Sequence, residues 1–311
     1  MGISYIEPAE RAWAGTRRLL LQPVDVEKWV VIGFAAFLAG LVGWPGVSFT
    51  PGWRFEFPPD FGNLIEAPFE NLLDLVRGSA WFLFGLPLGM ALLLLGVALL
   101  WLSSRGKLIF LDNMVRRRAA FVEPWKEFGK LGNSLFQWRL GLWLAVLLLA
   151  GVFLSPMFWL GRSLRGSGLA QPFGVLVTYG ATAGSIVIAA IAAYVALFLE
   201  NFVVPLMYRH KITANEAWQQ FLPLLRSNLP DFLAYGLVVL VGLVAVLLGL
   251  IAAAIVTCCI VPLLLSVPYV HSVLLLPLTG FYRLYSLEFL QQYGPEFTVL
   301  PAEEEAATSP D

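Results

Sequence analysis

The sequence predicts an all-α integral membrane protein with six transmembrane helices, and three observations lead to that prediction. Hydrophobic residues make up 59% of the 311 residues and charged residues only 13%, well below the roughly 25% of soluble domains. Several apolar runs approach or exceed the ~20 residues that a helix needs to cross the ~30 Å core of a bilayer. The Lys and Arg residues gather between alternate runs.

Six apolar segments are expected to form the spans. The first covers 26–44, and because no signal-peptide cleavage site follows it, we expect it to be retained. The next three lie at about 81–103, at about 138–160 and within 173–207. The apolar stretch 232–281 is too long for one helix, so we expect it to form two spans joined by a turn at 262–268.

The distribution of Lys and Arg predicts the orientation of the chain. Sixteen of the 20 fall in the N-terminal segment, in 105–139, in 209–226 and at Arg283, all on one side of a six-span arrangement. Positive charge marks the cytoplasmic side, so we expect a protein of the cell inner (cytoplasmic) membrane with both termini in the cytoplasm. Residues 1–295 then form one membrane domain with an external loop at 46–79, and 296–311 form a disordered acidic tail.

The chain repeats one order of features. The pattern Phe-Leu-acid-Asn ends the second span at Asp112 and the fourth at Glu200, and Glu288 follows the sixth, so the three acids are spaced 88 residues apart. A tryptophan precedes each odd-numbered span. These interfacial anchors are Trp13, Trp125 and Trp218. We predict a pseudo-threefold repeat of an interfacial helix followed by two spans, with units at about 9–115, 120–205 and 213–292.

The segments around these tryptophans are AWAGTRRLLLQPVDVEKW, GKLIFLDNMVRRRAAFVEPW and FVVPLMYRHKITANEAW. They resemble an uncharacterised family of prokaryotic multi-span membrane proteins, which is distantly similar to the membrane domain of glycerophosphoryl diester phosphodiesterases. The resemblance covers most of the chain and implies architecture alone. The soluble phosphodiesterase barrel has no counterpart in these residues, so the resemblance implies neither that activity nor any catalytic residue.

The three acids are candidates for an ion or proton site, because an ionisable side chain at membrane depth is costly and often functional. Asp112 has Arg116 one helical turn further on. Glu200 has only apolar neighbours on its own helix and therefore needs a partner from another helix, or a proton. The alternative is that Asp112, Glu200 and Glu288 are structural carboxylates that pair with Lys or Arg at the interface.

A basic cluster after the second span is the second candidate site. It consists of Arg116, Arg117, Arg118, Lys126 and Lys130. Cations beside a membrane are worth about 1 kcal/mol each at an anionic surface, so the cluster could contact anionic lipid headgroups. The alternative is that these residues only set the topology.

Signatures of enzymes are absent from the sequence: it has no Gly-x-Ser-x-Gly elbow, no His-Glu-x-x-His and no P-loop. His210 and His271 are expected at opposite sides of the membrane, so we expect no metal and no cofactor. The net charge of −1 gives no reason to expect a nucleic-acid partner. We expect a non-enzymatic membrane scaffold or accessory subunit that contacts anionic lipid or a partner protein. A small transporter or lipid-handling protein is the alternative.

Overall fold

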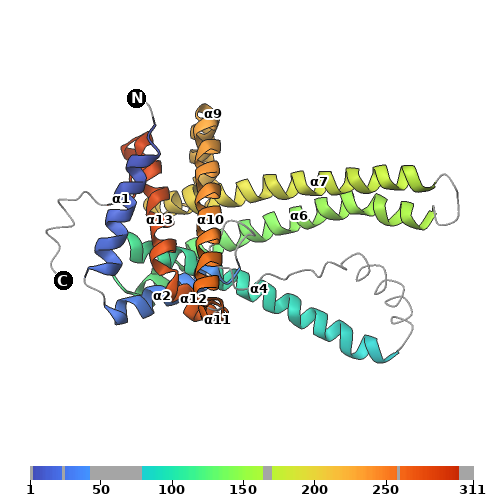
Figure 1. The fold of residues 1–311 in the computed structure, drawn as a ribbon, viewed down its shortest axis with the longest axis horizontal. Helices are drawn as coiled ribbons and strands as arrows, with labels where there is room; N and C mark the ends of the chain where they lie inside the picture. The colour runs from blue at the N-terminus through green and yellow to red at the C-terminus, as the bar shows by residue number, and fades with distance from the viewer. Residues whose placement is uncertain (1–2, 23–24, 43–78, 164–169, 258–259, 301–311) are drawn as a thin grey trace.

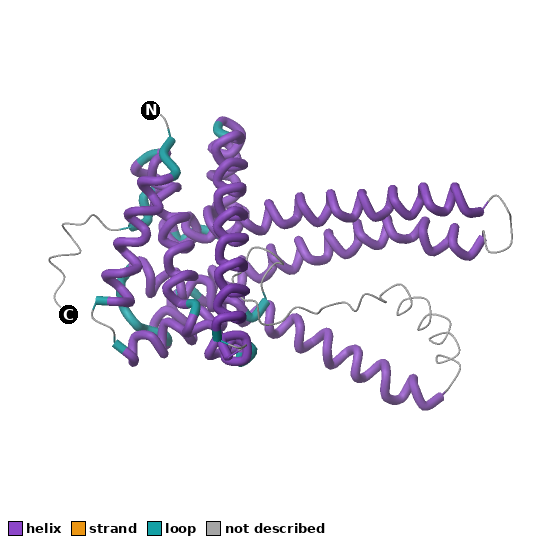
Figure 2. The backbone as a smooth tube through the Cα atoms, in the orientation of Figure 1, coloured by secondary structure: helices purple, strands orange, loops and turns teal. Residues whose placement is uncertain are grey.

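The computed structural model describes residues 3–22, 25–42, 79–163, 170–257 and 260–300, and every regular element within these ranges is a helix (Figures 1 and 2). The α-helices are α1 (Ile6–Thr16), α2 (Val26–Gly40), α4 (Ser79–Val115), α5 (Val122–Glu127), α6 (Gly129–Ser163), α7 (Ala170–Phe198), α8 (Val204–His210), α9 (Ala214–Ser227), α10 (Leu229–Val256), α11 (Ile260–Leu265), α12 (Pro268–Leu274) and α13 (Leu276–Leu290). The other helical turns are the π-helical η1 (Arg17–Leu21) and η2 (Leu199–Val203) and the 3-10 turns η3 (Gln291–Tyr293) and η4 (Pro295–Phe297). The all-α prediction is confirmed for the described residues.

Within the described residues, four helical segments are long and apolar enough to cross a membrane. They are Gly85–Val115, Gly129–Ser155, Tyr179–His210 and Leu229–Val256. A fifth span results if α12 and the helical segment Leu276–Tyr293, which are bent by 60° relative to each other, count as one. The expected first span is shorter than predicted, because α2 has only 15 residues. The six-span threefold arrangement is therefore not confirmed, and the expected external loop, up to residue 78, lies outside the described residues.

The last apolar stretch also departs from the expected pair of spans with one turn. After α10 the chain forms the short helix α11, and α12 then begins at Pro268, a residue that suits a first helical turn because its missing N–H has no partner there. The break between α12 and α13 falls at Leu275, just before Pro277. The stretch 232–281 thus contains parts of four helices, α10 to α13, where the sequence indicated two, and prolines stand at the start of α12 and of α13.

The long helices α4, α6 and α7 project from a common body (Figure 1). In Figure 1, α6 and α7 form a long hairpin and α4 extends away from the remaining helices. Large apolar side chains on these segments and on α10 are more than half exposed, among them Leu92, Leu148, Ile186 and Val241. Apolar surface of this extent needs a cover, and the hydrocarbon of a bilayer supplies one. The long apolar helices therefore favour a membrane protein.

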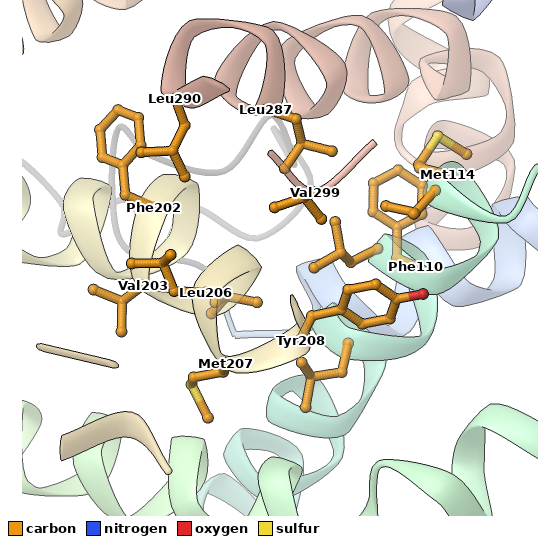
Figure 3. Packing of buried hydrophobic residues seen from close by; sticks show 14 of the residues in the cluster. Phe110, Met114, Phe202, Val203, Leu206, Met207, Tyr208, Leu287, Leu290 and Val299 are labelled. Carbon is orange, nitrogen blue, oxygen red and sulfur yellow. The ribbon is translucent and has the colours of Figure 1, made fainter. Parts of the chain in front are cut away.

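The core lies where the other ends of these helices meet. Phe202 of η2 packs against Phe232 and Tyr235 of α10 with ring centroids 5.0 and 4.9 Å apart. Figure 3 shows Met114 and Leu287 among the side chains that fill the same region. Val299, within the segment expected to be a disordered tail, is buried in this cluster. The tail from residue 301 onward lies outside the described residues.

Local sequence explains where several helices begin and how two of them approach. The Asp25 side chain accepts a hydrogen bond from the backbone N–H of Glu27 (2.9 Å) and so caps α2. Thr213 and Glu216 form a reciprocal capping box at the start of α9. At Gly106, a Cβ would lie 2.6 Å from the backbone nitrogen of Ala39, so only glycine permits this contact between α4 and α2.

A short helix precedes each of α2, α6 and α10, as the repeat predicts for its interfacial helices: these are α1, α5 and α9. Their tryptophans differ in environment. Trp13 is 51% exposed, whereas Trp125 and Trp218 are half-buried and pack against Trp101 and Trp138, with ring centroids 6.0 and 5.2 Å apart. Trp13 also packs edge-on against Phe281 of α13, with centroids 6.3 Å apart, so all three predicted interfacial anchors contact other helices of the protein.

Candidate functional site

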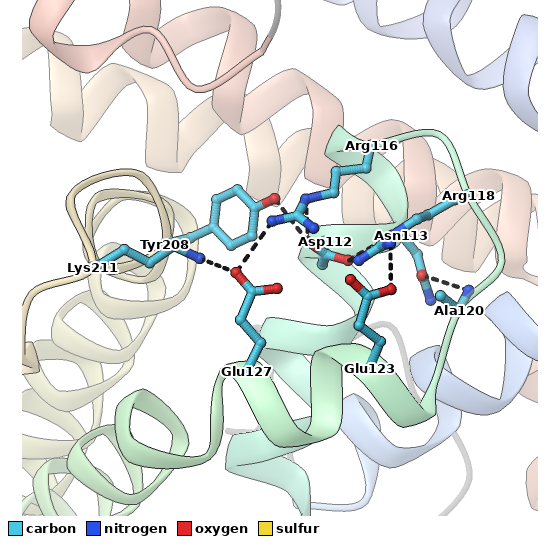
Figure 4. A network of polar contacts seen from close by, with 9 residues as sticks. All are labelled: Asp112, Asn113, Arg116, Arg118, Ala120, Glu123, Glu127, Tyr208 and Lys211. Carbon is cyan, nitrogen blue, oxygen red and sulfur yellow. Dashed lines mark hydrogen bonds and ion pairs between the residues drawn. The ribbon is translucent and has the colours of Figure 1, made fainter. Parts of the chain in front are cut away.

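Asp112 lies near the end of α4, fully buried, with three partners (Figure 4). Its Oδ1 accepts a hydrogen bond from the Tyr208 hydroxyl of α8 (2.9 Å) and faces Arg116 Nε at 3.0 Å. Its Oδ2 faces Arg118 Nη2 at 3.1 Å. The Arg116 pair is the one that the four-residue spacing predicted, while Tyr208 brings in a distant segment. These partners neutralise Asp112 inside the protein.

The same two arginines also form ion pairs with two further acids. Arg118 Nη1 lies 2.7 Å from Glu123 Oε2, and Arg116 Nη2 lies 3.2 Å from Glu127 Oε1. Lys211, just after α8, approaches the same Glu127 oxygen at 2.7 Å. We call these residues, together with Asp112 and Tyr208, the Asp112 network. It connects the end of α4 and the loop after it with α5, with α8 and with the loop after α8.

The network changes the acid–base properties of its outer carboxylate. Partial burial alone would raise the pKa of Glu127, but the hydrogen bond from Lys211 and the charges of Lys211 and Arg116 outweigh it and hold that pKa below its ordinary value of 4.5. Asp112 raises the pKa of both arginines against the opposing effect of their partial burial. Glu127, Arg116 and Arg118 are therefore charged at neutral pH.

The predicted basic cluster divides into two sets. Arg116 and Arg118 form ion pairs with acids of the Asp112 network. Arg117 is exposed and has a left-handed backbone (φ 52°), and Lys126 and Lys130 are exposed too. Only these last three present their charge outward without an ion pair to a described acid.

Glu200 lies in the π-helical turn η2, in the middle of the continuous helical segment that α7 and α8 form with it. Its Oε1 lies 2.7 Å from the Nζ of Lys107 on α4, and the two side chains are 12% and 8% exposed. The sequence indicated that Glu200 needs a partner from another helix, and Lys107 is that partner.

The π turn explains a second contact at Glu200. The N–H of Val204 donates to the carbonyl of Leu199, so it does not serve the carbonyl of Glu200 as an α-helix would require. The next residue, Pro205, has no N–H to offer. Arg283 Nη1 of α13 donates to this freed carbonyl. The carbonyl that the π turn leaves free thus binds a side chain of α13.

A third cation lies nearby. Arg139 of α6 is 4% exposed, and its Nη1 donates to the hydroxyls of Ser103 (3.2 Å) and Ser104 (3.0 Å) on α4. Its Nη2 donates to the carbonyl of Val42, which follows α2. We call Glu200, Lys107, Arg139 and Arg283 the Glu200 centre. Its members come from α4, α6, η2 and α13, so it joins distant parts of the chain.

The third predicted acid has a separate setting. Glu288 Oε2 accepts a hydrogen bond from Gln291 Nε2, one turn further along the chain. Among the described residues, no group of three or more His, Cys, Asp or Glu lies close enough to hold a metal ion. The structure therefore gives Asp112, Glu200 and Glu288 individual partners and does not bring them together as a metal-binding group in the described part of the chain.

A cavity of about 180 Å³ lies between α2 and α12 rather than at either acid. It is lined by Val26, Trp29, Val30 and Val273. This lining is apolar, and Asp112 and Glu200 lie outside it. The cavity offers no polar group with which to bind an ion.

Sequence reasoning missed the outer members of the Asp112 network, Glu123, Glu127 and Lys211, and four further residues of the two groups. These four are Lys107, Arg139, Tyr208 and Arg283. The signal for Lys107 was present, because a single cation in the run GKLIFLD calls for a partner by the same reasoning as a single acid. The other three of these four depend on which helices meet, and that information does not lie in local sequence.

Comparison with known proteins yields one match. The model of DUF7544, a family of unknown function, matches residues 4–261, which is most of the chain. No curated protein matches, and no solved structure does. The predicted similarity to the membrane domain of glycerophosphoryl diester phosphodiesterases is not supported by these comparisons.

Proposed function

The chain belongs to DUF7544, a family of unknown function, and from that premise we propose that it is a non-enzymatic membrane scaffold or accessory subunit. In this role it holds a cytoplasmic surface at the membrane, where that surface contacts anionic lipid or a partner protein. The proposal includes the finer architecture of the sequence analysis: six spans in three units, in the cell inner membrane, with both termini in the cytoplasm. The short helices before α2, α6 and α10 support the three units.

One observation carries the proposal: Asp112 and Glu200, which lie within candidate spans, are enclosed and ion-paired. Asp112 is fully buried among Arg116, Arg118 and Tyr208. Glu200 is ion-paired with Lys107 at 2.7 Å with both side chains almost inaccessible. A transport site has to expose its ionisable group to a water-filled path. Carboxylates packed in this way act as structural connections between helices.

The outer cation surface is the contact that we propose for lipid or a partner. It consists of Arg117, Lys126 and Lys130. Each side chain is exposed, and each lies in the connection between two predicted spans on the side that the Lys and Arg count assigns to the cytoplasm. Three such charges contribute about 3 kcal/mol at an anionic membrane surface.

Nanodiscs with and without anionic lipid test this surface. The triple variant R117Q/K126Q/K130Q is compared with the control K28Q/R209Q/R226Q, which loses the same charge at other exposed positions. The proposal expects anionic lipid to be enriched around the wild type, measured as lipid retained in native mass spectrometry, and to fall several-fold in the first variant only. Pull-down of membrane proteins from the source membrane is scored in parallel.

Equal lipid retention and equal partner capture by the two triple variants would contradict the role of this surface.

The orientation of the chain in the membrane has its own test. Tags at the two termini should both be accessible only from the cytoplasmic side of intact cells, and a tag on the outer side would remove the proposed arrangement.

A small transporter is the second candidate, and the π turn at Glu200 favours it, because π-helical turns in α-helices often mark functional sites. Proteoliposomes with an internal pH-sensitive dye and an imposed potential distinguish the two. A scaffold carries no proton flux above that of empty liposomes. A transporter carries flux that disappears in Glu200→Gln while the protein stays folded, and that result would replace the scaffold proposal.

A further inference from the structure

The Glu200 centre holds more positive than negative charge. Lys107, Arg139 and Arg283 bring three cations to it, and the charge of each acts on Glu200. Among the described residues, Glu200 is the only carboxylate in an ion pair with any of them. Three cations and one carboxylate leave an excess of two positive charges. Such an excess within spanning segments is costly and marks a functional site.

The arginines cannot remove this excess by losing protons, because a guanidinium stays charged in proteins. Among the described residues, the groups that bind Arg139 are neutral: the hydroxyls of Ser103 and Ser104 and the carbonyl of Val42. Such dipoles solvate a cation but do not cancel its charge. Within the described residues, the centre therefore keeps two positive charges that no carboxylate balances.

Arg283 has donors available for a further partner. Its Nη1 donates to the carbonyl of Glu200, while its Nε is buried and has no hydrogen-bond partner among the described residues. A guanidinium carries five N–H donors in a planar fork that matches the oxygen atoms of a carboxylate or phosphate. A buried donor without an acceptor is strongly unfavourable, so an acceptor is expected here.

We propose that Lys107, Arg139 and Arg283 bind an oxyanion of the phosphate class where α4, α6 and α13 meet. A phosphate offers enough oxygen atoms for several cations, and charge-assisted bonds to Arg and Lys are its usual mode of recognition. Basic sites between transmembrane helices bind lipid headgroups, so the phosphodiester of an anionic lipid and free phosphate are the two sources of this chemistry. The site is separate from the outer cation surface and does not rest on the proposed function.

Thermal unfolding of the full chain in nanodiscs tests the site. One arm compares phosphatidylcholine with a mixture of phosphatidylcholine and phosphatidylglycerol. The second arm adds inorganic phosphate to the phosphatidylcholine nanodiscs, with chloride at equal ionic strength as the reference. The proposal expects an increase in Tm in at least one arm. An increase with phosphatidylglycerol alone identifies the lipid headgroup, and an increase with inorganic phosphate identifies the free anion.

Two variants remove one cation each and keep hydrogen-bond donors: Arg139→Gln and Arg283→Gln. Each should bind the anion roughly tenfold more weakly, as expected for the loss of charge-assisted bonds. Arg226→Gln, which loses an exposed cation on α9, is the matched control and should keep the wild-type shift. The outer-surface triple variant should keep it as well, so the two proposals fail or succeed independently.

A third variant tests the charge argument without weakening the fold. Ser104 lies 3.0 Å from Arg139, so Ser104→Asp places a carboxylate beside the unpaired guanidinium. This variant should unfold at a higher temperature than the wild type in phosphatidylcholine and should show no further anion-dependent shift. The absence of any shift in the wild type would overturn the proposal. A full shift retained in all three of Arg139→Gln, Arg283→Gln and Ser104→Asp would overturn it too.

Discussion

Asp112 and Glu200 occupy equivalent places in the repeated sequence, yet they are held in different ways. Asp112 takes two of its three partners from its own segment, Arg116 and Arg118. Glu200 takes its partner, Lys107, from α4, far away in the chain. The backbone differs as well. The carbonyl of Asp112 accepts the ordinary helical bond from Arg116 N–H (2.8 Å), whereas that of Glu200 accepts from the Arg283 side chain.

This difference shows how a repeated motif can separate into two roles. The first copy lies closer to the protein surface. The side chains of Arg116 and Arg118 are 37% and 30% exposed, so water also solvates their charge. The second copy lacks local cations and lies in the interior, so its charge has to be met by other helices. Two reciprocal contacts hold the copies together. Lys107 of the first copy forms an ion pair with Glu200, and the Tyr208 hydroxyl of the second copy donates a hydrogen bond to Asp112.

The largest loss of stability is expected at the second copy of the motif, at Glu200. Glu200→Gln leaves the cations Lys107, Arg139 and Arg283 without their carboxylate, and removing one partner of a buried pair costs about 3–5 kcal/mol. Lys107→Met should cost less, because Glu200 keeps the charges of the two arginines. Thermal unfolding followed by tryptophan fluorescence in detergent measures both.

The double variant K107M/E200Q provides the control for this prediction. If the pair is a direct interaction, the double variant loses less stability than the two single variants add up to, with a coupling of about 1 kcal/mol or more. Additive losses, or a smaller loss in Glu200→Gln than in Lys107→Met, would contradict the charge balance that we assign to the Glu200 centre.

A smaller loss of stability is expected at the first copy of the motif, at Asp112. Asp112→Asn removes the carboxylate shared by Arg116 and Arg118, but both arginines are partly exposed and also reach Glu127 and Glu123. The expected cost is about 1–3 kcal/mol, that of buried hydrogen-bond partners left incomplete. Tyr208→Phe, which deletes a single bond of 2.9 Å, should cost about 1 kcal/mol. A cost for Asp112→Asn above that for Glu200→Gln would reverse the comparison.

The next effect is a pH dependence at Glu127. Because its pKa is lowered in the folded protein, its stabilising contribution is present above the ordinary value of 4.5 and is lost as the pH falls through the lowered pKa. The side chain is 33% exposed, so the contribution is below about 1 kcal/mol. The difference in Tm between the wild type and Glu127→Gln should shrink as the pH is lowered from neutral to about 3. A constant difference would show that the ion pairs do not cause it.

The smallest effect compares two residues with left-handed backbone, Arg117 (φ 52°) and Lys211 (φ 56°). Glycine adopts this conformation without strain, so Arg117→Gly should stabilise the protein by up to about 1 kcal/mol. Lys211→Gly relieves the same strain but loses the ion pair to Glu127 and the contact over the Phe128 ring at 4.0 Å. It should therefore give no gain. Equal gains in both variants would show that the Lys211 contacts contribute nothing.

Much of the helical structure was readable from sequence, because it depends on local composition. The apolar runs became α4, α6, α7 and α10. The first and last spans were harder, since α2 is short and the final stretch contains parts of α10 to α13, with prolines at the start of α12 and of α13. The candidate site was predicted in part: the Asp112–Arg116 pair follows from helical spacing, whereas the Arg139 contacts join segments that no local pattern connects.

By itself the sequence determined that this is a helical, apolar chain with paired acidic motifs, because hydrophobicity and helical periodicity are properties of neighbouring residues. Only the tertiary structure decided what those acids do. The need of Glu200 for a partner was visible in its apolar surroundings, but the identity of that partner depended on how closely α4 and η2 pack. The positive excess around Glu200 arises for the same reason, because it exists only where α4, α6 and α13 bring their cations together.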